Sequence, residues 1–149
     1  MRRWSRRHPL LRPRKRSPTK KTGPLEIKAA VYRPAATSGG RAGPVVVYLH
    51  GGSLINGGRE KFGKYPLREF FLPAGFVVVS IDYRLAPESK LPAIVEDREE
   101  AFRWVREKGP ALFGADPERI VAAGGSAGGF LALVAGFRVR PACVRWWAR

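Results

Sequence analysis

The stretch VAAGGSAGGFLAL, residues 121–133, carries the residues with the clearest chemical potential. Within it, residues 124–128 have the spacing G-x-S-x-G, which presents a serine on a sharp turn between a strand and a helix. Gly124 and Gly128 avoid collisions that side chains would cause in so tight a turn. A hydroxyl at a helix N-terminus suits attack on an acyl carbon, because amide dipoles there favour developing negative charge. We therefore predict that Ser126 is a nucleophile and that the Ala127 N–H is one oxyanion donor.

A turn of small residues also occurs in phosphate-binding loops and in plain connections between a strand and a helix. The stretch YLHGGSLINGG, residues 48–58, favours the nucleophile over these alternatives. Backbone N–H groups of a glycine-rich loop can approach an oxyanion closely because no Cβ intervenes. Gly51 and Gly52 are therefore the candidate oxyanion donors from a second, independent segment.

The predicted nucleophile lacks an obvious base. The chain has two histidines, His8 and His50, and both precede Ser126. His50 is either the base or a residue that braces the glycine loop by hydrogen bonding at the end of its strand, and the second interpretation is favoured. Asp82, in the segment DYRLAPE (residues 82–88), is either a triad acid or part of a structural ion pair with the arginine two residues further on, and the ion pair is the favoured interpretation. Because a serine hydroxyl needs an adjacent base, we expect weak reactivity.

Short apolar runs rich in β-branched residues predict the elements that position these loops. Such runs are typical of strands covered on both faces in a parallel sheet, whereas the alternation over residues 25–31 predicts a half-exposed strand. Helices are expected near residues 66–73, over residues 92–108 with a stop at Gly109-Pro110, and from Ala127 onward. The buried strands are predicted at residues 45–50, 75–83 and 120–123. This order predicts an α/β fold with a parallel, right-handed sheet and helices on both faces.

The positive charge is concentrated at the two ends of the chain. Of 28 Lys and Arg residues, 10 fall in residues 1–21 and 4 in residues 138–149, neither of which contains an acid. We expect a disordered basic tail over residues 1–23, an α/β domain over residues 24–137 and an irregular basic tail over residues 138–149. The tails could bind nucleic acid or an anionic membrane, but a solvated charge run is the favoured interpretation.

The remaining composition narrows the class of protein. A single cysteine, Cys143, excludes an internal disulfide, and no metal-ligand cluster is predicted. No apolar window approaches the ~20 residues of a membrane span, and we expect a cytoplasmic protein.

Together the three motifs resemble the α/β-hydrolase fold, in the branch of hormone-sensitive-lipase-like and feruloyl-esterase-like carboxylesterases. Members of that branch carry H-G-G-G, D-Y-R-L-A-P-E and G-D-S-A-G-G segments in this order, and the resemblance covers about residues 25–137. It implies hydrolysis of a small-molecule ester with no metal or organic cofactor. Ser126 would attack the carbonyl, and Gly51, Gly52 and Ala127 would hold the oxyanion.

The sequence departs from this pattern in three ways. Ser53 replaces the third glycine of the oxyanion loop, and Gly125 replaces the aspartate before the nucleophile. The family's acid and histidine follow the serine, but no histidine follows Ser126 here. The segment RVRPACVRWWAR, residues 138–149, resembles read-through in a wrong frame. We therefore expect the N-terminal part of a hydrolase, inactive or weakly active, or a truncated product without a catalytic role.

Overall fold

The computed structural model of the chain describes residues 16–22, 25–34, 42–64 and 66–138. Five of the elements in these residues are strands that form one sheet in the order β1-β2-β4-β3-β5. The strands are β1 (Arg16–Thr22), β2 (Leu25–Tyr32), β3 (Gly43–Leu49), β4 (Val77–Ile81) and β5 (Ala115–Gly124). The helices are η2 (Arg59–Lys64), α1 (Leu67–Phe71), α2 (Leu91–Phe113) and α3 (Ala127–Arg138).

The centre of the sheet is parallel, as predicted, and one side is antiparallel. β3 runs parallel to both β4 and β5, so the carboxyl ends of β3 and β5 lie side by side, with Leu49 opposite Gly124. β2 joins β4 in antiparallel register, and β1 in turn pairs antiparallel with β2. The sheet is therefore mixed and mostly parallel around the two loops predicted to carry chemistry.

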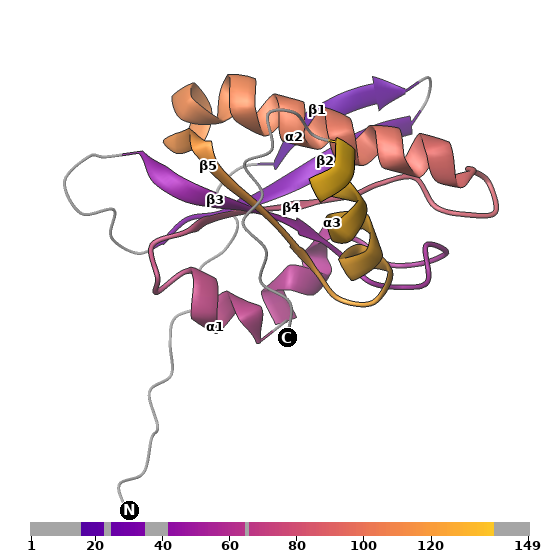
Figure 1. Ribbon diagram of the computed structural model, residues 1–149, viewed down its shortest axis with the longest axis horizontal. Coiled ribbons are helices and arrows are strands. Elements are labelled where there is room, and N and C mark those ends of the chain that lie inside the picture. The colour runs from indigo at the N-terminus through magenta and orange to yellow at the C-terminus, as the bar shows by residue number, and fades with distance from the viewer. Residues whose placement is uncertain (1–15, 23–24, 35–41, 65, 139–149) are drawn as a thin grey trace, which may run out of the picture.

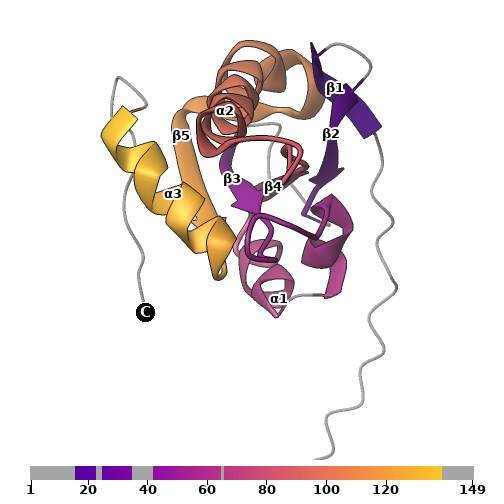
Figure 2. The same ribbon diagram turned by 90° about the vertical axis from the view of Figure 1, so that its right-hand side faces the viewer.

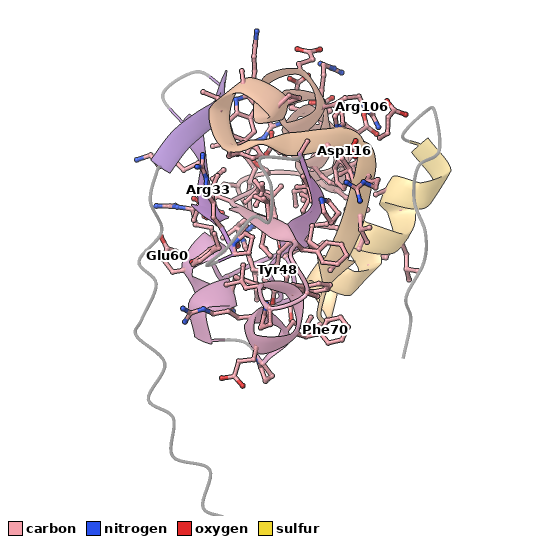
Figure 3. The ribbon with its side chains drawn as sticks, turned by 90° about the vertical axis from the view of Figure 1, so that its left-hand side faces the viewer. Arg33, Tyr48, Glu60, Phe70, Arg106 and Asp116 are labelled. Atoms are coloured by element: carbon pink, nitrogen blue, oxygen red, sulfur yellow. The ribbon has the colours of Figure 1, made fainter. Side chains whose placement is uncertain are left out.

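Helices cover both faces of the sheet, as predicted (Figure 1). The sheet therefore separates two hydrophobic clusters, one on each face. On one face, α2 and α3 pack against the inward residues of the strands, including Val47, Val79 and Ile120. On the other face, η2 and the segment around α1 enclose a smaller cluster in which the rings of Tyr48 and Phe62 are in contact. Figure 3 labels Tyr48. Seen along the strands, α3 flanks β5 and α2 lies over the sheet (Figure 2).

The strand at residues 25–31 was expected to be half exposed, and this was wrong for its second half. From Ala29 to Tyr32 every residue of β2 is buried. Ala29 and Val31 contribute to the larger core, whereas Ala30 and Tyr32 contribute to the smaller one. β2 lies inside the sheet because it pairs with β1 on one side and with β4 on the other. Sequence alternation alone does not reveal a second covering layer.

The Gly109-Pro110 pair does not end the second helix, contrary to expectation. α2 continues for another turn to Phe113 and ends at Gly114, which adopts a left-handed conformation with φ of 69°. That conformation is typical of a glycine cap. Phe113 is buried and its ring lies 5.6 Å from that of Trp104, so packing stabilises a turn that proline would otherwise disfavour.

The Asp116-Pro117 pair, a typical turn signal, lies inside β5. The strand begins at Ala115 rather than Ile120, and its pairing with β3 is irregular between these two residues. There Asp116 accepts a hydrogen bond from the Glu118 N–H at 3.0 Å and pairs with Arg119. The turn therefore appears as an irregularity of the strand, and regular pairing with β3 resumes at Ile120. The prediction of a buried strand over residues 120–123 holds only for Ile120, because the residues that follow it are half-buried.

Strand β1 lies within the segment that the sequence led us to expect as a disordered tail over residues 1–23. Its backbone pairs with β2 from Arg16 to Thr22. Backbone pairing along an open sheet edge does not require apolar side chains, which is why composition did not indicate it. Residues 1–15 and 139–149, and with them both proposals for tail binding, lie outside the described residues. In the part that is described, no helix is both long and apolar enough to cross a bilayer.

A buried ion pair fastens the loop after β4 to α2. Asp97 on α2 is 1% exposed, and its Oδ2 accepts hydrogen bonds from the Arg84 backbone N–H at 2.9 Å and from Arg84 Nε at 2.8 Å. Arg84 also donates to the Ala93 carbonyl oxygen at 2.8 Å. Since Arg84 follows Asp82 and Tyr83, this pair sets the direction in which the loop leaves the sheet.

Replacing Asp97 with alanine is expected to destabilise the fold by about 3–5 kcal/mol, because Arg84 would remain in place without its buried partner. The matched control is Arg103→Ala, which removes an exposed pair with Glu100 on the same helix and is expected to cost about 0–1 kcal/mol. Urea denaturation followed by circular dichroism measures both. Equal losses of stability for the two variants would contradict the structural role of the Arg84–Asp97 pair.

β5 is an edge strand of the described sheet and pairs there with β3 alone. An open strand edge is a template for pairing with another chain. We therefore expect the purified chain to self-associate increasingly with concentration, as measured by sedimentation velocity. A monodisperse monomer that unfolds cooperatively on heating would oppose this expectation.

Candidate active site

The turn between β5 and α3 holds Ser126 in a conformation that side chains rarely adopt. Ser126 is exposed and has φ of 55°, in the left-handed region, immediately before α3 begins at Ala127. The Gly128 N–H donates to the Gly125 carbonyl oxygen and the Phe130 N–H to the Ser126 carbonyl oxygen, each at 3.0 Å. A left-handed conformation at a residue other than glycine costs about 1–3 kcal/mol of folding free energy and is typical of functional turns.

The two glycines that flank this turn are required by its contact with β3. A Cβ on Gly128 would lie 2.0 Å from the Leu49 carbonyl oxygen and 2.7 Å from the His50 carbonyl oxygen. A Cβ on Gly124 would lie 2.5 Å from the same Leu49 oxygen. All three distances are far inside van der Waals contact. The start of α3 therefore sits directly against the end of β3.

This contact brings the glycine loop after β3 to the serine. A Cβ built on Gly51 would lie 3.4 Å from the Ser126 Cβ and 2.8 Å from the Gly125 carbonyl oxygen. The two predicted segments therefore meet at one point, although Gly51 and Ser126 are 75 residues apart in sequence. Gly52 continues the loop with φ of 131°, and its carbonyl accepts the N–H groups of Ile55 and Asn56 at 2.9 and 3.0 Å.

The loop turns sharply where Ser53 stands in place of a third glycine. Ser53 and Leu54 both have positive φ, 55° and 64°. The Leu54 carbonyl oxygen accepts a hydrogen bond from the Ala86 N–H at 2.8 Å, and this bond ties the turn to the segment after β4. Strain at two successive residues is therefore offset by contacts outside the loop.

His50 braces the loop, the alternative that the sequence analysis favoured. Its side chain is 1% exposed, and its ring stacks on that of Tyr83 with centroids 4.1 Å apart and an interplanar angle of 10°. Nδ1 lies 3.0 Å from the Gly51 carbonyl oxygen, and because a carbonyl only accepts, Nδ1 carries the proton. Burial lowers the pKa of His50 below its usual value, so the ring stays neutral around pH 7.

Asp82 forms a structural ion pair, as expected, but with a different arginine. Its carboxylate accepts hydrogen bonds from both the backbone N–H and the guanidinium of Arg59. The expected partner Arg84 instead binds Asp97. Arg59 follows the glycine loop directly, so the pair fastens the far end of that loop to the end of β4. Sequence proximity suggested Arg84, whereas the parallel pairing of β3 and β4 brings Arg59 closer.

Tyr83 is the residue at this site that sequence reasoning missed. Its hydroxyl donates to the His50 carbonyl oxygen at 2.5 Å, and the residue is 3% exposed. Burial raises the pKa of Tyr83 to about 12, so the hydroxyl remains a donor at neutral pH. The only sequence signal was its place in the DYRLAPE segment, which gave no indication of what the ring would contact.

Charged groups near the loop do not form a metal site. Among the described residues, no group of three or more His, Cys, Asp or Glu side chains is arranged to hold an ion. The exposed side chain of Lys61 contacts the loop, with Nζ 3.4 Å from the Gly51 carbonyl oxygen.

Comparison with known proteins identifies relatives of the chain. A family model described as the α/β hydrolase fold matches residues 46–145. The chain is 42% identical over 118 residues to esterase LipI of Mycobacterium tuberculosis, a match that covers 79% of this chain and 36% of LipI. It is 43% identical over 112 residues to carboxylesterase NlhH of the same species, covering 75% of this chain and 34% of NlhH. The chain thus spans about a third of the length of these relatives.

A solved structure has the same arrangement of elements. The native form of esterase Est2 from Thermogutta terrifontis superimposes with a TM-score of 0.72 at 34% sequence identity, covering 85% of this chain and 45% of Est2. The family match spans both the glycine loop and the serine turn. This agreement in sequence and in structure confirms the resemblance stated from the three motifs, and the chain belongs to the α/β-hydrolase family.

Proposed function

We propose that this site transfers the acyl group of a small carboxylic ester, with Ser126 as the nucleophile. One observation carries the proposal: the Gly51 backbone lies against Ser126 at the N-terminus of α3, so that an added methyl at Gly51 would lie 3.4 Å from the Ser126 Cβ. Main-chain amides can approach an oxyanion only where no side chain intervenes, and this loop meets that condition.

The reaction begins when Ser126 Oγ attacks the carbonyl carbon of the ester. A bond forms between Oγ and that carbon, the carbonyl electrons move to its oxygen, and the serine proton passes to a base. The N–H groups of Gly51, Gly52 and Ala127 bind the resulting oxyanion, assisted by the positive end of α3. Collapse of the intermediate expels the alcohol, which takes up a proton, and water releases the acid by the same steps.

The described residues do not supply a histidine base for Ser126. His50 is buried, stacked on Tyr83 and hydrogen bonded through Nδ1 to its own loop. The only other histidine, His8, precedes the described residues. Without an adjacent base a serine hydroxyl is a poor nucleophile, although an oxyanion hole alone still leaves residual catalysis. We propose that the chain by itself is inactive or weakly active.

The relatives support an ester with a small acyl group. One Est2 structure is described with propionate bound and another with butyrate bound, and a relative from Pseudomonas putida is named ethyl acetate hydrolase. These descriptions concern those proteins. For this chain they favour short aliphatic esters as the first substrates to test.

Hydrolysis of p-nitrophenyl propionate by the purified chain is expected to exceed that of Ser126→Ala only marginally, because His50, the one histidine among the described residues, is held within its own loop. Initial rates of p-nitrophenolate release at neutral pH measure both. Robust turnover that disappears in Ser126→Ala would overturn the proposed weak activity and show that another residue serves as the base. Equal rates would mean that the chain by itself is inactive, and the labelling of Ser126 described next then tests the nucleophile.

Gly51→Ala is expected to slow stoichiometric phosphorylation of Ser126 by paraoxon roughly tenfold or more, since the added methyl pushes the loop away from Gly125 and weakens oxyanion binding. Est2 is described as phosphorylated by paraoxon, which makes this reagent a suitable probe. Intact-protein mass spectrometry follows the reaction.

The matched control is Gly63→Ala, whose added Cβ would meet only the Tyr32 hydroxyl, at 3.6 Å. It should react at the rate of the unmodified chain. A folded Gly51→Ala variant that reacts as fast as Gly63→Ala would refute the role of Gly51 in the site.

A further inference from the structure

Two peptide groups of the glycine loop carry the proposed oxyanion donors. In each of them a side chain donates a hydrogen bond to the carbonyl oxygen. The Gly51 N–H shares one planar peptide group with the His50 carbonyl, and the Gly52 N–H shares the next with the Gly51 carbonyl. In a trans peptide the N–H and C=O point in opposite directions. A hydrogen bond that fixes one of these carbonyls therefore also fixes the direction of the N–H across the same plane.

Tyr83 holds the first of these planes. Its hydroxyl donates to the His50 carbonyl oxygen at 2.5 Å, in a buried position. The same oxygen faces Gly128 on its other side, where a Cβ would lie 2.7 Å away. The carbonyl is thus confined between the hydroxyl and α3. A hydrogen bond to a carbonyl also polarises the peptide group, which makes the N–H on the opposite side a better donor.

The His50 ring holds the second plane. Nδ1–H donates to the Gly51 carbonyl oxygen at 3.0 Å, and Lys61 Nζ donates to the same oxygen at 3.4 Å. The ring is itself fixed, because Tyr83 stacks on it and Gly57 packs against it so closely that an added Cβ would lie 2.5 Å from Nδ1. His50 is therefore held in the orientation in which its donor meets its own loop.

We infer that Tyr83 and His50 are positioning residues, which aim the N–H groups of Gly51 and Gly52 at the oxyanion by binding the carbonyls of the same two peptide groups. This inference rests on the proposed function of Ser126. It assigns a catalytic consequence to the segment after β4, whose residues do not themselves touch the reacting atoms. Such positioning matters in a reaction in which negative charge develops on an oxygen, because preorganised donors stabilise that charge.

The contacts that surround Tyr83 make this positioning rigid. The segment from Asp82 to Ala86 binds the glycine loop at two points, Tyr83 to His50 and Ala86 to Leu54. A third contact joins Asp82 to Arg59, the residue that directly follows the loop. The Arg84–Asp97 pair anchors the same segment to α2. Tyr83 can therefore fix the loop against the whole core rather than against a movable neighbour.

Tyr83→Phe tests the first half of the inference, because it removes the hydroxyl and keeps the ring that stacks on His50. The matched control is Tyr32→Phe, which removes a hydroxyl from another buried tyrosine, in the smaller core. In spectra of ¹⁵N-labelled chain, the Gly51 amide resonance is expected to move in Tyr83→Phe and to stay in place in Tyr32→Phe. Loss of packing alone would not single out this resonance, because the amide nitrogen is conjugated with the carbonyl that loses its donor.

The rate of Ser126 phosphorylation by paraoxon gives the functional readout. In this reaction Ser126 Oγ bonds to phosphorus, p-nitrophenolate leaves and the serine proton passes to solvent. Tyr83→Phe is expected to slow the reaction about tenfold or more, towards the ~10²–10³-fold loss that removal of one oxyanion donor causes. Tyr32→Phe should react as the unmodified chain does.

His50→Asn and His50→Leu test the second half and do not depend on whether Tyr83→Phe folds. Asparagine can place an amide N–H near the position of Nδ1, whereas leucine supplies no donor. We expect the asparagine variant to retain more of the phosphorylation rate and a Gly52 amide resonance closer to that of the unmodified chain. Equal loss in both variants would count against a role for the Nδ1 donor.

The two readouts separate the possible failures. If the Gly51 resonance does not respond to Tyr83→Phe, or if it responds while the phosphorylation rate equals that of Tyr32→Phe, positioning by Tyr83 is refuted. If paraoxon does not modify Ser126 of the unmodified chain at all, the proposed function fails instead.

Discussion

The close contact between the end of β3 and the turn that opens α3 is the constraint on which the site depends. The Leu49 carbonyl oxygen occupies space that a side chain on either Gly124 or Gly128 would fill. Because parallel pairing sets Leu49 opposite Gly124, the two loops that leave these strands must start from adjacent points. The glycine loop and the serine are neighbours for this reason, and a larger residue at either glycine would separate them.

A second set of contacts decides the shape of the glycine loop. Backbone strain at Ser53 and Leu54, and the buried ring of His50, would not persist in an isolated loop. The segment after β4 supplies what offsets them: an ion pair, a backbone hydrogen bond and the Tyr83 hydroxyl. The loop is therefore stabilised by the segment that follows β4, a strand that is adjacent to β3 in the sheet but lies beyond η2 and α1 along the chain. This arrangement suits preorganisation, in which donors are oriented before the charge develops.

Sequence reasoning identified the family, the fold class and the two buried strands β3 and β4. These features follow from local patterns: β-branched runs for β3 and β4, and glycines where the backbone makes a turn too tight for side chains. It placed the end of α2 too early because Gly109-Pro110 is a strong local stop, whereas the burial of Phe113 is a property of the folded chain. It also missed β1, since backbone pairing along a sheet edge leaves little trace in composition.

The sequence by itself determined that a serine would stand on a sharp turn, that a glycine-rich loop would follow a buried strand, and that no histidine would follow the serine. These conclusions depend only on residue types and their spacing. The tertiary structure decided that Arg59 rather than Arg84 would pair with Asp82, and that Tyr83 would bind the His50 carbonyl. The physical reason is that such pairings depend on strand order and register, which bring together side chains and carbonyls from segments whose separation in sequence carries no information about their contact.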